Sequence, residues 1–133
     1  MKKKSDVKTT VVRARESFKR IIIRQDFTKR HVHVRCFVAG YHYHDGESII
    51  DLLKEKEKML LIREFYNPYD DNAIAVYTAD YVQLGYLPKV LSPLIAPHLE
   101  KKNDVQCRLT RINRKAYHDP YVRLEIAVRF PLE

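Results

Sequence analysis

REFYNPYDDNAIAV, at residues 63–76, and GYLPK, at residues 85–89, decide the fold of this chain. An apolar run at residues 59–62 enters the first stretch, and a second apolar run at residues 73–77 leaves it. Between the two runs lies a turn of Asn, Pro, Tyr and Asp, which are residue types that favour chain reversal. The pattern therefore predicts strand, polar turn, strand. A turn that only reversed the chain would not need a tyrosine beside an acceptor-only carboxylate.

Alternating apolar residues predict further strands on both sides of this stretch. Six strands are expected, at residues 31–38, 59–64, 73–78, 81–86, 105–112 and 121–130. A short helix is expected near residues 49–53, and two short helical pieces are expected after Pro88, because Pro93 and Pro97 interrupt an apolar stripe. The predicted fold is mostly β (α+β), a small OB-like six-stranded β-barrel with two or three short helices.

The positive charge is concentrated at the N-terminus. Residues 1–30 hold 11 Lys/Arg and three Asp/Glu, a net charge of +8, whereas residues 31–133 hold 14 of each sign and are neutral. We therefore expect a basic extension over 1–30, partly helical or disordered, and one domain over 31–133. Helical spacing supports the helix through Val11, Ala14, Phe18 and Ile21, but the run at residues 21–23 could instead open a strand that packs on the barrel.

The two cysteines indicate the compartment. Cys36 and Cys107 share strand parity with apolar neighbours, so we expect buried free thiols, with a disulfide as the alternative. No apolar run approaches the ~18 residues of a membrane span, and no apolar signal core follows the basic start. The expectation is a cytoplasmic protein with no membrane partner, associated with the nucleoid if the source is bacterial.

Three ordered blocks, FVAGYHY at 37–43 and the two stretches quoted above, resemble the HIRAN domain over about residues 32–113. This module is known from Snf2-type DNA-repair helicases and from stand-alone bacterial proteins. The resemblance implies a non-catalytic DNA-binding module that captures the 3′-hydroxyl end of single-stranded DNA in DNA repair or replication-fork processing. Since the chain contains no motor, we expect it either to need a partner, such as a helicase or nuclease, or to act as an end-binding accessory.

The resemblance assigns roles to four residues. It implies that Tyr43 and Tyr69 hold the terminal base by stacking, with Tyr41 as the substitute for Tyr43 if the alignment slips by two residues. It implies that Asp70 accepts a hydrogen bond from the free 3′-hydroxyl, and that Lys89, at a helix start, lies near the last internucleotide phosphate. The residues alone leave structural roles open: Tyr69 lying over the barrel end, Asp70 capping turn amides, and Lys89 on the solvated surface.

Three more positions complete the expected DNA-binding set. Asn67 serves either the turn or the DNA. Tyr86 stands where some family members carry histidine, and His42 stands where some carry arginine. Neutral histidine and tyrosine lack a permanent charge, which weakens the case for phosphate contacts at both positions.

Two other functions fit part of the sequence. A protein-interaction or scaffolding module without DNA binding fits the neutral domain and His42, whereas the Tyr69–Asp70 pair and the basic extension oppose it. A metal-dependent nuclease would use His42 and His44, which share a face if the segment is extended, together with Asp45. No serine or cysteine nucleophile motif is present, and three glycines cannot build a Gly-rich phosphate loop. We therefore expect no enzyme activity, no cofactor and no metal; the oligomeric state and the preference for DNA over RNA stay open.

Overall fold

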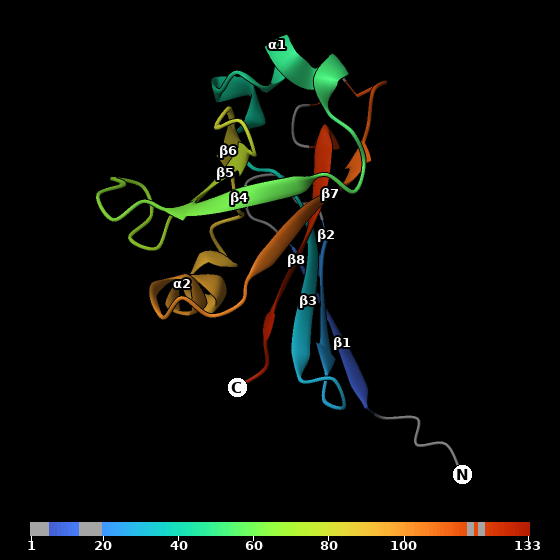
Figure 1. Cartoon of the computed structure of the whole chain (residues 1–133), viewed down its shortest axis with the longest axis vertical. Coiled ribbons are helices and arrows are strands. Elements are labelled where there is room, and N and C mark those ends of the chain that lie inside the picture. Colours follow the sequence, from blue (N-terminus) through green and yellow to red (C-terminus); the bar gives the residue numbers. More distant parts are fainter. Residues whose placement is uncertain (1–5, 14–19, 117–118, 120–121) are drawn as a thin grey trace.

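Eight antiparallel strands form one sheet in this computed structural model, which describes residues 6–13, 20–116, 119 and 122–133. The strand order is β1-β2-β3-β8-β7-β4-β5-β6 (Figure 1). The strands are β1 (Val7–Arg13), β2 (Arg20–Asp26), β3 (His31–Phe37), β4 (Lys58–Arg63), β5 (Ile74–Thr78), β6 (Gln83–Tyr86), β7 (Gln106–Ile112) and β8 (Leu124–Pro131). All six strands predicted from alternation are present, within a few residues of the expected ends.

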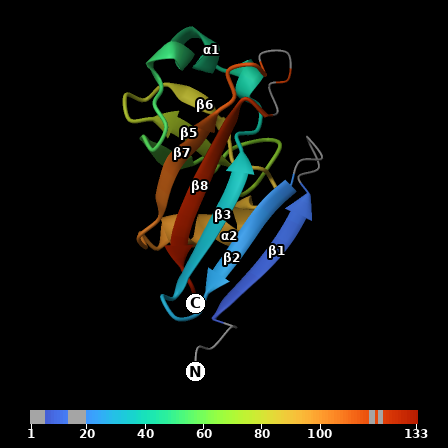
Figure 2. The same cartoon turned by 90° about the vertical axis from the view of Figure 1, so that its right-hand side faces the viewer.

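The helix expected across Val11–Gln25 is wrong. The described residues of this segment form a hairpin, in which β1 pairs with β2 from Val7↔Asp26 to Arg13↔Arg20, and β2 pairs in turn with β3. The physical reason is burial, because Ile21 is 1% exposed and belongs to the main core. Figure 2 shows β1 and β2 continuing the sheet beside β3. Residues 1–5 and 14–19 of the extension, which was expected to be partly helical or disordered, lie outside the described residues, and residues 7–9 lie in β1.

The sheet is open, so the expected barrel closure is not confirmed, and the described residues form eight strands rather than six. Its two edges are β1 and β6. An isolated bridge just beyond β3 nevertheless reaches β6, where the amides of Ala39 and Tyr86 each donate to the other's carbonyl at 2.8 Å. This bridge holds the chain before residue 40 against the strand that carries Tyr86.

Gly85 is the residue that permits this approach. Its φ is +154°, and a side-chain Cβ at this position would overlap the carbonyl oxygen of Ala39 and lie 2.7 Å from Cγ1 of Val38. No other residue type combines this backbone conformation with this lack of bulk. Gly85 therefore sets the spacing between β6 and the segment that follows β3.

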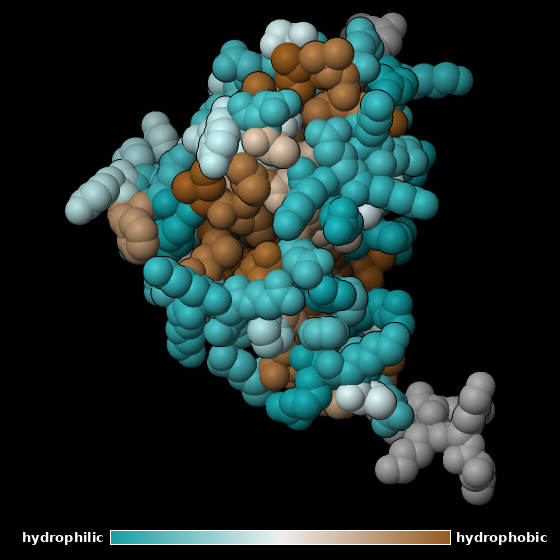
Figure 3. All heavy atoms as spheres, in the orientation of Figure 1, coloured by the Kyte–Doolittle hydropathy of each residue, from teal (hydrophilic) through white to brown (hydrophobic). Residues whose placement is uncertain are grey.

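The core lies on the inner face of the sheet and is closed by one helix, α2 (Ser92–Glu100), which packs beside β4 and β8. Along β8 every second residue is buried, as the alternation predicts. The two helical pieces expected after Pro88 are one helix, because Pro93 lies in its first turn and Pro97 is accommodated inside it. Hydrophobic side chains are exposed in the middle of the face drawn in Figure 3, and hydrophilic ones surround them.

Short helical segments cover one end of the sheet: η1 (Tyr41–Tyr43), α1 (Gly46–Ile49) and η2 (Ile50–Leu52). The last two fulfil the expectation of a short helix near residues 49–53. Cys36 and Cys107 are free and buried, as predicted. Among the described residues no helix is long and apolar enough to cross a membrane.

Candidate functional site

The loop between β4 and β5 is built around the side chain of Arg63. Its guanidinium donates to the carbonyl of Asp71 at 2.6 Å and to the carbonyl of Glu64 at 3.0 Å, and it pairs with Glu100 of α2 at 3.2 Å. The amide of Glu64 donates to the carbonyl of Ala73 at 2.8 Å, which closes the base of the loop. Arg63 therefore satisfies carbonyls that a loop of this length would otherwise leave without donors.

Two side chains shape the tip of this loop. The Oδ1 atom of Asn67 accepts the amides of Tyr69 at 2.8 Å and Asp70 at 3.1 Å. One carboxylate oxygen of Asp70 accepts the amide of Asn72 at 2.9 Å, and among the described residues the other oxygen has no hydrogen-bond partner. The turn role considered for Asn67 and Asp70 is thus present, and it uses only one of the two oxygens of Asp70.

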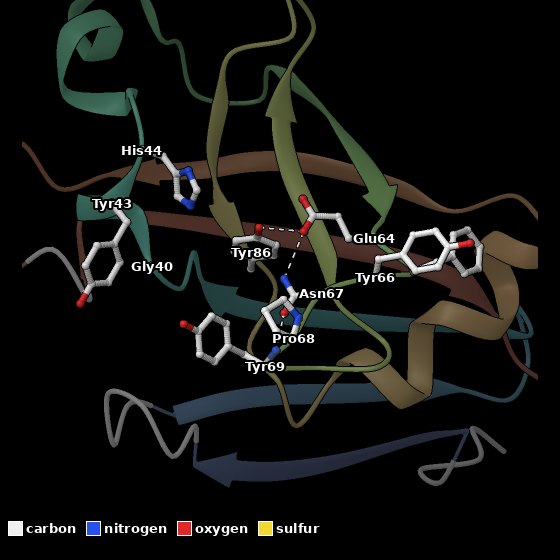
Figure 4. Close-up of a pocket in the computed structure, with 10 residues that line it drawn as sticks. Gly40, Tyr43, His44, Glu64, Tyr66, Asn67, Pro68, Tyr69 and Tyr86 are labelled. Atoms are coloured by element: carbon white, nitrogen blue, oxygen red, sulfur yellow. Dashed lines mark hydrogen bonds between the residues drawn. The ribbon is translucent and has the colours of Figure 1, made fainter.

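A cavity of about 960 Å³ opens between this loop and the segment that follows β3. Tyr43 and Tyr69 are 79% and 83% exposed on its walls, and Figure 4 shows these rings with His44 and Tyr86 around one space. Tyr66 points to the other side of Glu64 in the same view. The complete lining is Gly40, Tyr43, His44, Glu64, Phe65, Tyr66, Asn67, Pro68, Tyr69 and Tyr86.

Glu64 also lines this cavity, and its motif position alone predicts no role for it. Its Oε1 atom accepts the hydroxyl of Tyr86 at 2.8 Å and the side-chain amide of Asn67 at 3.1 Å. Burial and this hydrogen bond to Glu64 raise the pKa of Tyr86, so Tyr86 stays protonated and donating. Glu64 therefore positions one tyrosine and the loop tip together. One feature of the sequence could have indicated this role: Glu64 is an acidic residue at the end of an apolar strand, inside the 63–76 stretch.

A second cavity of about 180 Å³ adjoins the first. The two share four residues, Gly40, Asn67, Tyr69 and Tyr86. Asp70 and Lys89 line the smaller cavity only. Of the seven predicted DNA-binding residues, six line one or both cavities; His42 lines neither, and its ring lies 3.9 Å from that of Tyr43.

Tyr41 and Tyr43 differ completely in exposure. Tyr41 is 2% exposed, and its hydroxyl donates to Glu47 at 2.7 Å, while the guanidinium of Arg123 bonds the same carboxylate at 3.1 and 3.2 Å. Burial opposes ionisation of Glu47, but the bonds from Tyr41 and Arg123 outweigh it, so its pKa is lowered. Tyr41 is therefore a structural anchor, and Tyr43 is the tyrosine available for stacking.

Comparison with known proteins identifies the family, because the HIRAN domain model matches residues 31–133. This chain belongs to the HIRAN domain family. It is 36% identical over 69 residues to the helicase-like transcription factor of Oryctolagus cuniculus, a match that covers 52% of this chain and only 6% of that protein's length.

Two solved structures share the fold of this HIRAN domain. The HIRAN domain of human HLTF matches with a TM-score of 0.59 at 24% identity, over 76% of this chain and 77% of that one. A protein from Lactobacillus plantarum matches with a TM-score of 0.63 at 20% identity, over 96% of this chain and 99% of that one. The β1–β2 hairpin lies before the residues that the family model matches.

Two local expectations for this HIRAN domain need correction. His42 and His44 do not share a strand face, because residues 41–43 form a turn of 3-10 helix rather than an extended segment. In the described part of the chain no three His, Cys, Asp or Glu side chains converge as metal ligands would. Lys89 does not start a helix: it lies in a turn, and α2 begins three residues later at Ser92.

Proposed function

We propose that this HIRAN domain binds the 3′-hydroxyl end of single-stranded DNA. The observation that carries the proposal is the junction of two cavities at Tyr69 and Tyr86, one walled by exposed aromatic rings and the other lined by Asp70 and Lys89. A base fits the first environment, and a terminal hydroxyl with its neighbouring phosphate fits the second.

Aromatic exposure supports stacking as the source of affinity. Large aromatic rings that face solvent on the rim of a cavity leave apolar surface unburied, and such surface commonly marks a binding site. Tyr43 and Tyr69 come from separate segments, η1 and the β4–β5 loop, so a base would enter between two independently held rings (Figure 4). Stacking on an aromatic side chain is worth about 1–3 kcal/mol per base.

The carboxylates support end recognition. Asp70 and Glu64 place two negative groups around the cavities, and a phosphate there would be repelled. A hydroxyl is a donor, and the unpaired oxygen of Asp70 is an acceptor. Lys89, exposed at the rim of the small cavity, supplies the positive charge for the phosphate one nucleotide inward.

The proposal extends to a wider role. The proposed site holds an end and performs no reaction on it, so we propose a non-catalytic module. It would work with a helicase or nuclease in DNA repair or replication-fork processing, in the cytoplasm.

Replacing Tyr69 with alanine should weaken binding of a four-nucleotide strand by about 1–3 kcal/mol, because one stacking face is lost. Tyr43→Ala should behave in the same way, and melting temperatures should change little for either exposed residue. Fluorescence anisotropy measures the affinities. Tyr81→Ala is the matched control, since Tyr81 is 71% exposed and lines neither cavity. Equal losses in all three variants would contradict a specific stacking site.

Wild-type protein should prefer a four-nucleotide strand ending in a 3′-hydroxyl over one ending in a 3′-phosphate by about tenfold or more. One hydrogen bond to a charged group is worth about 1.5–3 kcal/mol. Asp70→Asn should reduce this preference while keeping an oxygen for the amide of Asn72. Asp71→Asn, the neighbouring exposed carboxylate, should retain it. Equal affinity of wild-type protein for the two strands would show that end capture is wrong.

A further inference from the structure

The outer face of the sheet carries basic side chains in register across four strands. Arg24 of β2 lies opposite His33 of β3, His33 lies opposite Arg129 of β8, and Arg129 lies opposite Gln106 of β7. In the next row, Arg35 of β3 lies opposite Ala127, and Ala127 lies opposite Arg108. These residues alternate with buried ones, so they face away from the core; Figure 2 shows the four strands side by side.

This face is hollowed rather than flat. A cavity of about 380 Å³ and one of about 180 Å³ meet at His33 and Ala127, the smallest side chain of the two rows. We call the combined surface the basic groove, and its charged or titratable basic residues are Arg24, Lys29, His33, Arg35, Arg108 and Arg129. Residues of β2, β3 and β8 line the larger cavity, and residues of β3, β7 and β8 line the smaller one, so no single strand forms the groove.

Few acidic groups offset these charges. Glu125 pairs with Arg35 at 3.6 Å, and Asp26 accepts the amide of Lys29 at 2.9 Å. Among the described residues neither Arg24 nor Arg129 forms a salt bridge. Within each row His33 or Ala127 separates the arginines, so no two permanent charges lie directly opposite each other. The arginines nevertheless converge on one groove, where their summed positive potential favours an anionic ligand.

The pKa of His33 responds to the positive charges around it. Burial lowers its pKa, and the positive charges of Arg129, His31 and Arg24 lower it further, while Asp26 acts in the opposite direction. An anion bound in the basic groove would reverse the electrostatic part of this effect. The pKa of His33 therefore provides a local measure of occupancy of the basic groove.

We propose that the basic groove binds the phosphodiester backbone of a nucleic acid, away from any end. Neighbouring strands lie about 4.7–4.9 Å apart, so the row of Arg24, His33 and Arg129 presents closely spaced donors to consecutive phosphate oxygens. The β4–β5 loop extends to the left in Figure 1, and β2 and β3 lie to the right, so the groove is separate from the candidate site. The choice of nucleic acid over another polyanion rests on the proposed function.

The β1–β2 hairpin adds positive charge to this face of the sheet. Residues 31–133 are neutral overall, yet Arg35, Arg108 and Arg129 from that part converge on one face. The β1–β2 segment, from the part that carries the +8 charge, adds Arg24 beside them, and Lys29 follows in the turn. A neutral domain thereby acquires a locally positive groove.

A closed circular single strand tests the groove without offering an end. The double variant Arg24→Gln/Arg129→Gln should bind the circle about tenfold more weakly than wild type. Its slope of log affinity against log salt should be smaller by about 1.4, since each lost phosphate contact on a single strand contributes about 0.7. Arg13→Gln/Arg20→Gln is the control of equal charge change, placed opposite each other at the far end of the hairpin. Melting curves establish that all variants are folded.

Unchanged affinity of the double variant for the circle would overturn the proposal, as would an equal loss in the control pair, which would indicate bulk charge alone. Adding the circle should raise the pKa of His33, followed by NMR, and an unmoved pKa would place the DNA elsewhere. Binding to vesicles of anionic lipid with none to the circle would overturn the nucleic-acid assignment. Four-nucleotide strands with a 3′-hydroxyl should bind the double variant as well as wild type. If end capture fails while the circle result holds, only the proposed function is lost.

Discussion

Deletion of residues 1–30 is expected to unfold the protein or lower its melting temperature severely, so that long and short DNA strands are lost together. The hairpin is part of the sheet, and Ile21 is 1% exposed in the main core, with Val12 and Ile23 packed against that core. Fully burying one such side chain is worth about 1.5–3 kcal/mol, a large share of a stability of about 5–15 kcal/mol. The deletion also leaves β3 as a new unpaired edge.

Point variants separate loss of the core from loss of charge. Ile21→Ala should lower the free energy of unfolding by about 2–5 kcal/mol, measured by denaturant titration, with no change in charge. Val11→Ala is the matched control in the same hairpin; Val11 is 54% exposed, so the expected change is within about 0.5 kcal/mol. A stable deletion variant that still binds a four-nucleotide strand would mean that the hairpin is an independent extension.

Gly85→Ala is expected to destabilise the protein by about 2–4 kcal/mol and to abolish binding at the candidate site. The new Cβ would overlap the carbonyl of Ala39, and the φ of +154° is itself unfavourable for alanine. Relief of the overlap requires the Ala39–Tyr86 bridge to open, which moves Tyr86 away from Glu64. Chemical denaturation and anisotropy with a short 3′-hydroxyl strand measure the two effects.

Gly40→Ala is the control for backbone strain alone. Gly40 also has a positive φ, +66°, but a Cβ there would meet side-chain atoms only at 4.0 Å, an ordinary contact. Its cost should be about 1–2 kcal/mol, from the left-handed conformation. If the two alanine variants lose equal stability, the overlap with Ala39 does not govern the Gly85 position.

The strands of the fold could be predicted wherever one face is buried and the other is solvated. In β8 the alternation of Leu124, Ile126 and Val128 with less buried, smaller or charged residues is sufficient. The hairpin could not be predicted because its first strand lacks such a buried face. β1 is an exposed edge strand with almost no buried residue, so no alternation marks it, and its apolar residues happened to match helical spacing.

The residues of the candidate site could be predicted only where they belong to the family motifs. Tyr43, Tyr69, Asp70 and Lys89 line two adjoining cavities, as their assigned roles require, and their DNA contacts stay a prediction. Glu64 was missed because an acidic residue at a strand end is indistinguishable, in sequence, from a solvated one. The basic groove was also out of reach, since Arg24, Arg129 and Arg108 become neighbours only through the register between strands.

The reactivity of the two buried cysteines can be used to detect when the centre of the sheet opens. Burial raises the pKa of Cys36 to about 12, and it raises the pKa of Cys107 well above its usual value. Only the thiolate attacks electrophiles, so both sulfurs are inert while β3, β8 and β7 stay together. Thiol-reactive reagents will therefore modify the protein only when the centre of the sheet separates, and at the rate of that separation where the reaction is faster than reclosing. No label, tag or engineered residue is needed to time that event in wild-type protein.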